Sequence, residues 1–251
     1  MLFFVTIFNF RNLNNILELM VRNKKLKDYF NLGMRKLKHR KGFGVHSPFA
    51  FAIITEVIEE KLPYYAYRTM QSIYTKQAPT SYKVACLLHR LTNRFQCRTI
   101  VQVACDGGFT MLPILLADSR NRLITVASEA LQAETEKRMD LLHVKREQYG
   151  FLRDLSMLEE GKKYDMIVIN DNPFNQNDAE AAAEELVEWT LNHMHEETLI
   201  FVKGIKPRQS MELFWDRLCD RDEISITMDL YDHGLGVVKQ NFFKQHYIVA
   251  F

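Results

Sequence analysis

The stretch from residue 99 to residue 127 reads TIVQVACDGGFTMLPILLADSRNRLITVA and decides the fold class. It contains a short apolar run at 99–104, a tight turn at Asp106-Gly107-Gly108, an apolar helical segment at 110–117 and a second apolar run at 123–127. Short apolar runs separated by a helix are typical of parallel strands that are buried on both faces. This stretch therefore predicts a strand–helix–strand unit of a parallel sheet.

The same alternation continues along the chain on both sides of this unit. Strands are expected at 165–170 and 198–202, with a weak strand at 151–155, and helices at 82–95, 130–146, 178–193 and 209–219. The last three apolar stretches, beginning at residues 224, 236 and 245, follow one another without helices, so we expect an antiparallel hairpin at the sheet edge. The pattern predicts an α/β fold with helices on both faces of a mostly parallel sheet.

The first 45 residues are expected to form a basic helical N-terminal extension, and residues 46–251 the α/β domain. Residues 22–41 contain nine Lys or Arg and one acid, a charge of +8 in a chain whose net charge is only +2. Such a charge run is usually a solvated face, so nucleic-acid binding through residues 22–41 is kept as the less favoured interpretation.

Residues 1–10, MLFFVTIFNF, are apolar but lack a basic start and a small-residue cleavage site, and they are too short to span a bilayer. We expect them to pack on the domain or to precede the native start, and we expect no membrane span. The four cysteines show neither a CxxC nor a Cys/His ligand spacing. This indicates reduced thiols in a cytoplasmic protein, without a disulfide framework or a zinc site.

Ligands of open parallel sheets bind at the carboxyl ends of the strands. The glycine pair Gly107 and Gly108 permits a tight turn there, and the following helix offers free N–H groups to a polar ligand. Taken alone, the signal is weak, since a plain strand-to-helix turn explains it equally well.

Three segments carry a more specific resemblance: HRKGFGVHSPFAF at 39–51, MDLYDHGLGVV at 228–238 and QHYIVAF at 245–251. With the order of elements, they resemble a bacterial family of class I S-adenosylmethionine (SAM)-dependent methyltransferases, whose members carry a GxHSPF segment and a C-terminal DLF…G…QHF pattern. The resemblance covers roughly residues 35–251. It implies a Rossmann-like methyltransferase fold, with a mostly parallel seven-stranded sheet whose last strand is antiparallel, and SAM as the cofactor.

The positions that the family uses for the cofactor are altered in this sequence. The first family motif, acid-x-Gly-x-x-x-Gly, is represented by Gln102, Ala104 and Gly108. Ala127 replaces the acid that would accept hydrogen bonds from the ribose hydroxyls. Glu129 could substitute for it, although a solvated first-turn acid is the simpler interpretation.

After the later strands, Asn170 stands in place of an acid and Lys203 in place of an acidic run. Lys203 would bring a positive charge near the cofactor sulfonium, which costs free energy. Met211 and Trp215 still match, so the alignment holds. The cofactor positions that the resemblance implies are Gln102, Ala104, Asp106, Gly107, Gly108, Ala127, Ser128, Glu129, Asn170, Asp171 and Lys203.

No catalytic residue or metal ligand is predicted. His46 and Ser47 are expected to cap the helix that follows them, and Asp229 and His233 to be turn and edge residues. Two functions stay open: an active SAM-dependent methyltransferase of a small molecule or macromolecule, or a non-catalytic binding or scaffold protein that retains the fold and whose basic N-terminal segment contacts an anionic partner. Weak or absent SAM binding is expected. Methyl transfer requires mainly alignment of donor and acceptor, so the absence of a catalytic dyad from the sequence does not exclude methyltransferase activity. The loss of several ligand positions favours the second, and the acceptor substrate and oligomeric state are not predicted.

Overall fold

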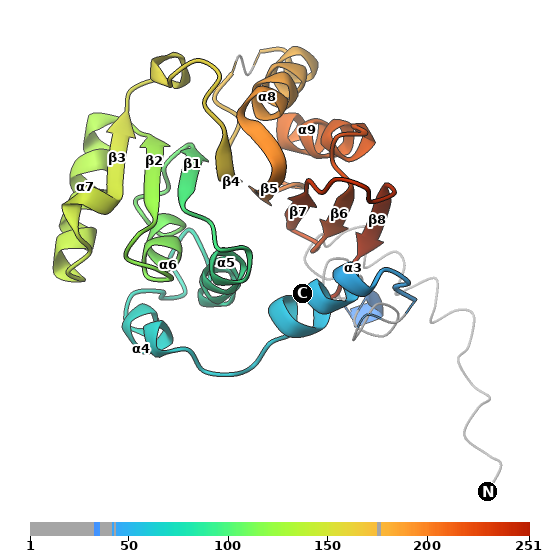
Figure 1. The fold of residues 1–251 in the computed structure, drawn as a ribbon. Coiled ribbons are helices and arrows are strands. Elements are labelled where there is room, and N and C mark those ends of the chain that lie inside the picture. The colour runs from blue at the N-terminus through green and yellow to red at the C-terminus, as the bar shows by residue number, and fades with distance from the viewer. Residues whose placement is uncertain (1–32, 36–41, 43, 175–176) are drawn as a thin grey trace, which may run out of the picture.

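The computed structural model describes residues 33–35, 42, 44–174 and 177–251. These residues form one eight-stranded sheet with the order β3-β2-β1-β4-β5-β7-β6-β8, covered by helices on both faces (Figure 1). Within the described ranges, no helix is long and apolar enough to cross a membrane. Most of the basic helical extension expected at residues 1–45 lies outside them, and residues 33–35 are helical.

The first five strands are parallel, as the alternating pattern predicted: β1 Thr99–Val103, β2 Arg122–Val126, β3 Tyr149–Leu152, β4 Tyr164–Ile169 and β5 Met194–Lys203. The predicted hairpin is confirmed, because β6 Ile226–Asp229 and β7 His233–Val237 pair antiparallel, and β7 also pairs antiparallel with β5. The sheet has eight strands where the resemblance implied seven. The closing segment adds β8, Gln245–Ile248, parallel to β6, so β8 and not the hairpin forms the edge.

The helices divide between the two faces. One side of the sheet carries α3 Pro48–Ile53, the π-helix η1 Ile54–Ile58, α5 Tyr82–Phe95, α6 Met111–Leu115 and α7 Glu129–Leu141, and α4 Tyr65–Gln71 packs on α5. The other packs against α8 Ala179–His193 and α9 Gln209–Asp220. Two single 3₁₀ turns, η2 Arg146–Gln148 and η3 Leu155–Met157, flank β3. α7 ends earlier than expected, because the chain leaves the helix at Leu142 and His143 takes a left-handed φ of +55°.

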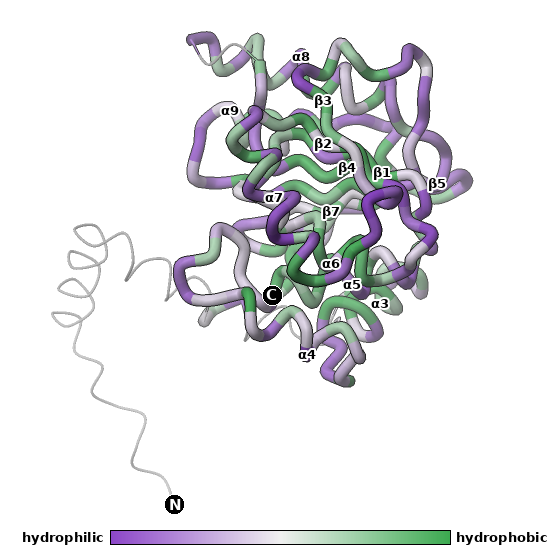
Figure 2. Tube along the Cα trace, turned by 90° about the vertical axis from the view of Figure 1, so that its left-hand side faces the viewer, coloured by the Kyte–Doolittle hydropathy of each residue, from purple (hydrophilic) through white to green (hydrophobic). Residues whose placement is uncertain are grey.

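The core follows the two-residue period of the strands. Ile100, Met166 and Phe201 point to the α5 face, while Val101, Ile167 and Val202 point to the α8 face, and all six are fully buried. In Figure 2 the inner strands are mostly hydrophobic, and hydrophilic residues lie mainly in the segments around them. The hairpin packs tightly on α9, since a Cβ at Gly234 would lie 2.4 Å from the Trp215 ring.

The HSPF segment fastens the N-terminal helices to the domain. Ser47 caps α3 as predicted, because its Oγ accepts a hydrogen bond from Ala50 N at 3.3 Å. His46 is exposed. The Phe49 ring lies edge-on to Phe242, with the centroids 5.4 Å apart, and so joins α3 to the C-terminal part of the chain.

Arg35 belongs to the basic run and makes a bidentate pair with Asp229 at the end of β6, at 2.9 and 2.7 Å. Asp229 also accepts a hydrogen bond from Tyr231 N at 2.7 Å, which is the turn role predicted for it. Burial raises the pKa of Asp229, but these donors outweigh it and hold the pKa below its ordinary value. Arg35, one of the basic residues at 22–41, therefore forms an ion pair with the α/β domain.

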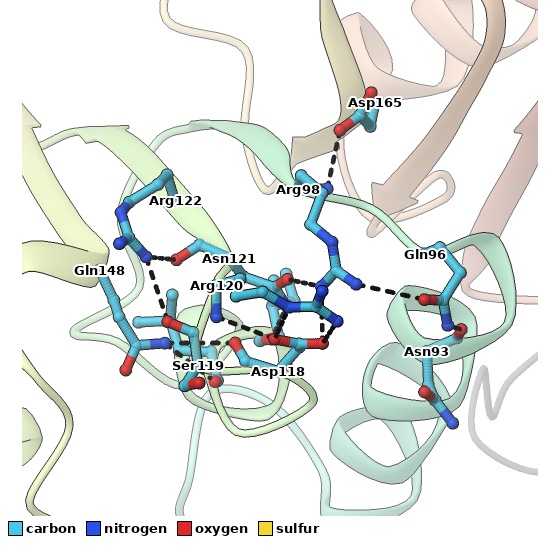
Figure 3. Close-up of polar contacts among 12 residues, drawn as sticks. Asn93, Gln96, Arg98, Asp118, Ser119, Arg120, Asn121, Arg122, Gln148 and Asp165 are labelled. Atoms are coloured by element: carbon cyan, nitrogen blue, oxygen red, sulfur yellow. Dashed lines mark hydrogen bonds and ion pairs between the residues drawn. The ribbon is translucent and has the colours of Figure 1, made fainter.

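A dense ionic cluster lies at the amino ends of β1 and β2 (Figure 3). Asp118 pairs there with Arg98 at 2.7 Å and with Arg120 at 2.8 Å. Hydrogen bonds from the Arg120 side chain and backbone hold the pKa of Asp118 well below its usual range. The cluster ties the start of β1 to the loop before β2, so it stabilises the end of the sheet away from the expected ligand edge.

Candidate functional site

The carboxyl ends of β1, β4 and β5 lie side by side. Val103 pairs with Ile169, and Ile169 pairs with Val202 in the parallel ladder. The residues that follow these strands therefore meet at one edge of the sheet. They are Ala104 after β1 and Asn170 after β4, with Lys203 as the last residue of β5.

The turn after β1 is shaped by its packing against α7. Gly107 and Gly108 have φ values of +73° and +89°, and a Cβ on Gly108 would lie 2.9 Å from both Thr135 and Met139. The glycines are therefore required by backbone conformation and by the close approach of α7. Ala104 also has a left-handed φ of +63°, a conformation that costs a non-glycine residue about 1–2 kcal/mol.

A buried hydrogen-bond network links the ends of β1 and β4 through Thr110. The Thr110 hydroxyl can donate to Gln102 Oε1 at 2.8 Å or to Asp106 Oδ1 at 3.0 Å, and it accepts from Asn170 Nδ2 at 2.9 Å. The same Asn170 amide also donates to the Ala104 carbonyl at 2.9 Å. Gln102 is fully buried, so its amide serves as an internal partner of the turn.

Lys203 extends this network to β5. Its Nζ lies 3.0 Å from Asp106 Oδ2 and 2.7 Å from the Thr80 hydroxyl, and Thr80 in turn lies 2.8 Å from the same carboxylate oxygen. The Lys203 and Asp106 side chains are only 16% and 8% exposed. The Lys203 charge is therefore compensated inside the protein. We call Thr80, Gln102, Asp106, Thr110, Asn170 and Lys203 the carboxyl-edge cluster.

His233 lies next to this cluster, because it pairs with Lys203 across the β5–β7 ladder. Burial, followed by the charges of Lys203 and Lys83, lowers the pKa of His233 to about 4, so the ring is neutral at pH 7. Its Nδ1 is buried without a hydrogen-bond partner in the described structure. The prediction of an edge residue was wrong for His233, since β7 lies inside the sheet between β5 and β6.

The end of β2 contributes no carboxylate to the cluster. Ala127 is 4% exposed, and its N–H donates to the Leu152 carbonyl at 3.0 Å. Ser128 and Glu129 are exposed, and Glu129 pairs with Arg153 at 2.8 Å on the surface, with side chains 80% and 77% exposed. Glu129 therefore has the solvated position that was the simpler interpretation.

Asp171 also turns away from the cluster. Its carboxylate pairs with Arg208, the residue before α9, and accepts a hydrogen bond from Asn172 N at 2.9 Å. The structure thus joins Gln102, Ala104, Asp106, Asn170 and Lys203 in one network, with Gly107 and Gly108 shaping the turn, and leaves Ser128, Glu129 and Asp171 outside it.

Two members of the cluster were not predicted from the sequence. Thr110 could have been found from its spacing, because Asp106 caps the following turn by accepting from Thr110 N at 3.0 Å. Thr80 has no such signal, since it precedes α5 and lies 26 residues from its partner Asp106. Among the described residues, no group of three or more His, Cys, Asp or Glu is arranged to hold a metal ion.

Comparison with known proteins gives a result for the fold alone. No family model matches the sequence, and neither does any curated protein. An O-methyltransferase from Bacillus cereus in complex with SAH (S-adenosylhomocysteine) superposes with a TM-score of 0.54 at 17% identity, covering 75% of this chain and 97% of that one. The O-methyltransferase TomG from Streptomyces achromogenes in complex with SAM gives 0.52 at 16% identity, covering 75% and 96%.

A third solved structure, the SAH-bound methyltransferase PaMTH1 from Podospora anserina, gives a TM-score of 0.56 at 11% identity, covering 78% of this chain and 97% of that one. Almost the full length of each of these proteins is matched. The chain therefore has a Rossmann-like class I methyltransferase fold, as the resemblance implied.

Proposed function

We propose that this chain is a SAM-dependent methyltransferase-like protein in which cofactor binding, and with it methyl transfer, is weakened or lost. The observation that carries the proposal is the contact of Lys203 with Asp106 and Thr80 at the carboxyl ends of the strands, at 3.0 and 2.7 Å. An enzyme of this fold would use polar groups at this edge for its ligand. Here the groups bind one another.

The residues at the edge fit SAM poorly. Ala127 leaves the end of β2 without an acceptor pair for the ribose hydroxyls, and Glu129, the acid that could substitute for it, pairs with Arg153 on the surface. Loss of such an acceptor costs about 1.5–3 kcal/mol, or roughly tenfold to a hundredfold in affinity. Ala104 adds a methyl group to a turn with a left-handed backbone. The Asn170 amide donates within the cluster to Ala104 and Thr110.

The alternative is a non-catalytic binding or scaffold protein that retains the fold. It is supported by the hydrogen bonds and the ion pair that satisfy most polar groups of the carboxyl-edge cluster internally, so that the edge is held together without a ligand. The two proposals differ in residual activity and agree on weak cofactor binding.

Thermal unfolding of the full chain with and without 1 mM SAM or SAH tests the proposal, at roughly the concentration that would saturate a micromolar site. A ligand whose concentration exceeds its dissociation constant a thousandfold stabilises the folded state by about 4 kcal/mol, which raises the melting temperature by several degrees. We expect no shift beyond that produced by 1 mM methionine. A ligand-specific shift of several degrees would overturn the proposal.

A further inference from the structure

The connection from β3 to β4 leaves part of the sheet without a covering helix. Residues 153–163 are all described, and their only helical piece is the single turn η3, drawn in yellow in Figure 1. A crossover between parallel strands usually contains a helix that buries the apolar sheet face. On the α8 face Val101 and Ile167 are fully buried, whereas Ile124 and Leu152, towards β3, are only half-buried.

A groove of about 1090 Å³ lies between this connection and α8. Its apolar lining comes from Val126, Leu155, Leu158, Phe174 and Trp189. Trp189 is half-buried, and its ring stacks on His193 with the centroids 4.4 Å apart. We call this surface the α8 groove.

The α8 groove runs along the strands. It extends from Val126, at the carboxyl end of β2, to Lys163, which precedes the amino end of β4. A strand of about six residues spans roughly 20 Å, which equals about 13 residues of α-helix. A helix of three to four turns therefore matches the length of the strands along which the groove's lining residues lie.

Its walls are acidic. Four carboxylates line the groove, those of Asp154, Glu160, Glu185 and Glu188, against one ammonium group, that of Lys163. Lys163 Nζ donates to the Asn192 carbonyl at 2.8 Å, and Glu188 pairs with Arg221 at 2.8 Å. Within the described part of the chain, Glu160 and Glu185 form no ion pair, and both are exposed. An apolar floor between acidic walls complements a helix with one apolar and one basic face.

We propose that the α8 groove docks a basic amphipathic helix of another protein. Apolar side chains at positions i, i+3 or i+4, and i+7 would contact Trp189 and Leu158, and Lys or Arg on the flanks would meet Glu160 and Glu185. The acidic walls disfavour nucleic acid as the occupant. The inference goes beyond the proposed function and does not depend on it, because no residue of the carboxyl-edge cluster lines the groove.

The test titrates the full chain with a 14-residue peptide of Leu and Lys, in which Leu recurs at helical spacing. The controls are a peptide with Glu for Lys and a peptide with the Leu/Lys order scrambled. The chain has two tryptophans, and Trp215 is only 4% exposed, so a change in tryptophan emission reports on Trp189. We expect saturable binding of the Leu/Lys peptide alone, weakened by added salt. The emission change should disappear in Trp189→Phe, while the calorimetric heat persists.

The double variant Glu160→Lys/Glu185→Lys should bind the peptide at least tenfold more weakly. The matched control, Glu56→Lys/Glu223→Lys, changes the net charge equally at two exposed acids outside the groove and should leave the affinity unchanged. Equal binding of the scrambled peptide, or equal loss in both double variants, would overturn the proposal. So would the absence of binding, including the case in which the chain's own basic segment already fills the groove.

Discussion

The ammonium group of Lys203 and the carboxylate of Asp106 lie 3.0 Å apart and join the end of β5 to the turn after β1. The two residues are 97 positions apart in the sequence, and Thr80 completes the contact from the segment before α5. Substitution of either partner of such a buried pair destabilises the folded state, because the remaining charge is left uncompensated. It also gives the edge a fixed arrangement of charge that any ligand must accommodate.

The Lys203 charge should make the site discriminate between SAM and SAH. SAM carries a sulfonium and SAH a neutral sulfur, so the ammonium disfavours SAM by about 1–4 kcal/mol at 4 Å, reduced by its pairing with Asp106. We expect weaker binding of SAM than of SAH, and a ratio of dissociation constants that falls at least severalfold in Lys203→Met. Ligand-observed NMR measures both constants in the weak range. An unchanged ratio would show that Lys203 lies away from the sulfur.

Restoring the altered positions should recover affinity for SAH. The variant Ala104→Gly/Ala127→Glu/Lys203→Asn removes the turn methyl, supplies an acceptor pair and removes the ammonium. Asn is chosen at position 203 because a second carboxylate would repel Asp106, which lies 3.0 Å from the native ammonium. We expect at least tenfold tighter binding by calorimetry, and the three effects need not add. Urea unfolding must first show that the variant is folded, since Ala127 is buried. A folded variant without improved binding would contradict the assignment of these positions.

Ala104→Gly should by itself stabilise the protein. Ala104 has a φ of +63°, which glycine adopts without strain, whereas the added chain entropy of glycine offsets part of the gain. We expect the free energy of unfolding to rise by about 0.5–1 kcal/mol in urea titrations. The matched control is Ala133→Gly on the exposed side of α7, which should lower it by about 1 kcal/mol. A loss at position 104 as large as that at 133 would argue against the left-handed turn.

Acid should destabilise the fold through its buried histidines. Burial, followed by the Arg90 charge, lowers the pKa of His89 to about 4 from its ordinary value of 6.5. As the pH falls from 6.5 to 4, the unfolded chain takes up a proton that folded His89 does not, so stability declines by about 1.4 kcal/mol per pH unit for each such histidine. His89→Phe retains a ring between Tyr64 and Tyr67 and should remove the contribution of His89 to the pH dependence of the free energy of unfolding. Urea titrations at pH 7.5, 6, 5 and 4.5 measure it, and an unchanged slope would contradict a neutral buried His89.

The sequence was sufficient to predict the parallel strands and α5, because strands buried on both faces give uninterrupted apolar runs and the apolar residues of α5 recur at helical spacing. The apolar stretch from residue 245 was predicted as a strand, but its pairing with β6, the end of α7 and the π-helix were not. The π-helix at Ile54–Ile58 and the left-handed His143 depend on local packing, and β8 pairs with β6, which lies about 20 residues earlier in the sequence. The boundary between a basic extension and the domain at residue 45 stays a prediction.

The convergence of several strand-end residues was predicted, but their contacts with one another were not, and their role in cofactor binding stays a prediction. The resemblance implied Gln102, Ala104, Asp106, Asn170 and Lys203 as neighbours, and these residues do converge. The sequence presented Lys203 as an unpaired charge, because nothing in the residue order reveals that Asp106 lies beside it. The compensation by Asp106 and Thr80 depends on the crossing of three separate segments. Such contacts are set by tertiary packing, which periodicity does not report.

The central claim, that the carboxyl-edge cluster binds its own groups in place of SAM, is tested most directly by calorimetric titration of the full chain with SAH. SAH is the stronger test ligand because it lacks the sulfonium charge that Lys203 opposes. The account predicts no saturable heat at ligand concentrations up to about 0.1 mM, a range in which a micromolar site would saturate. A dissociation constant in the low micromolar range would contradict it.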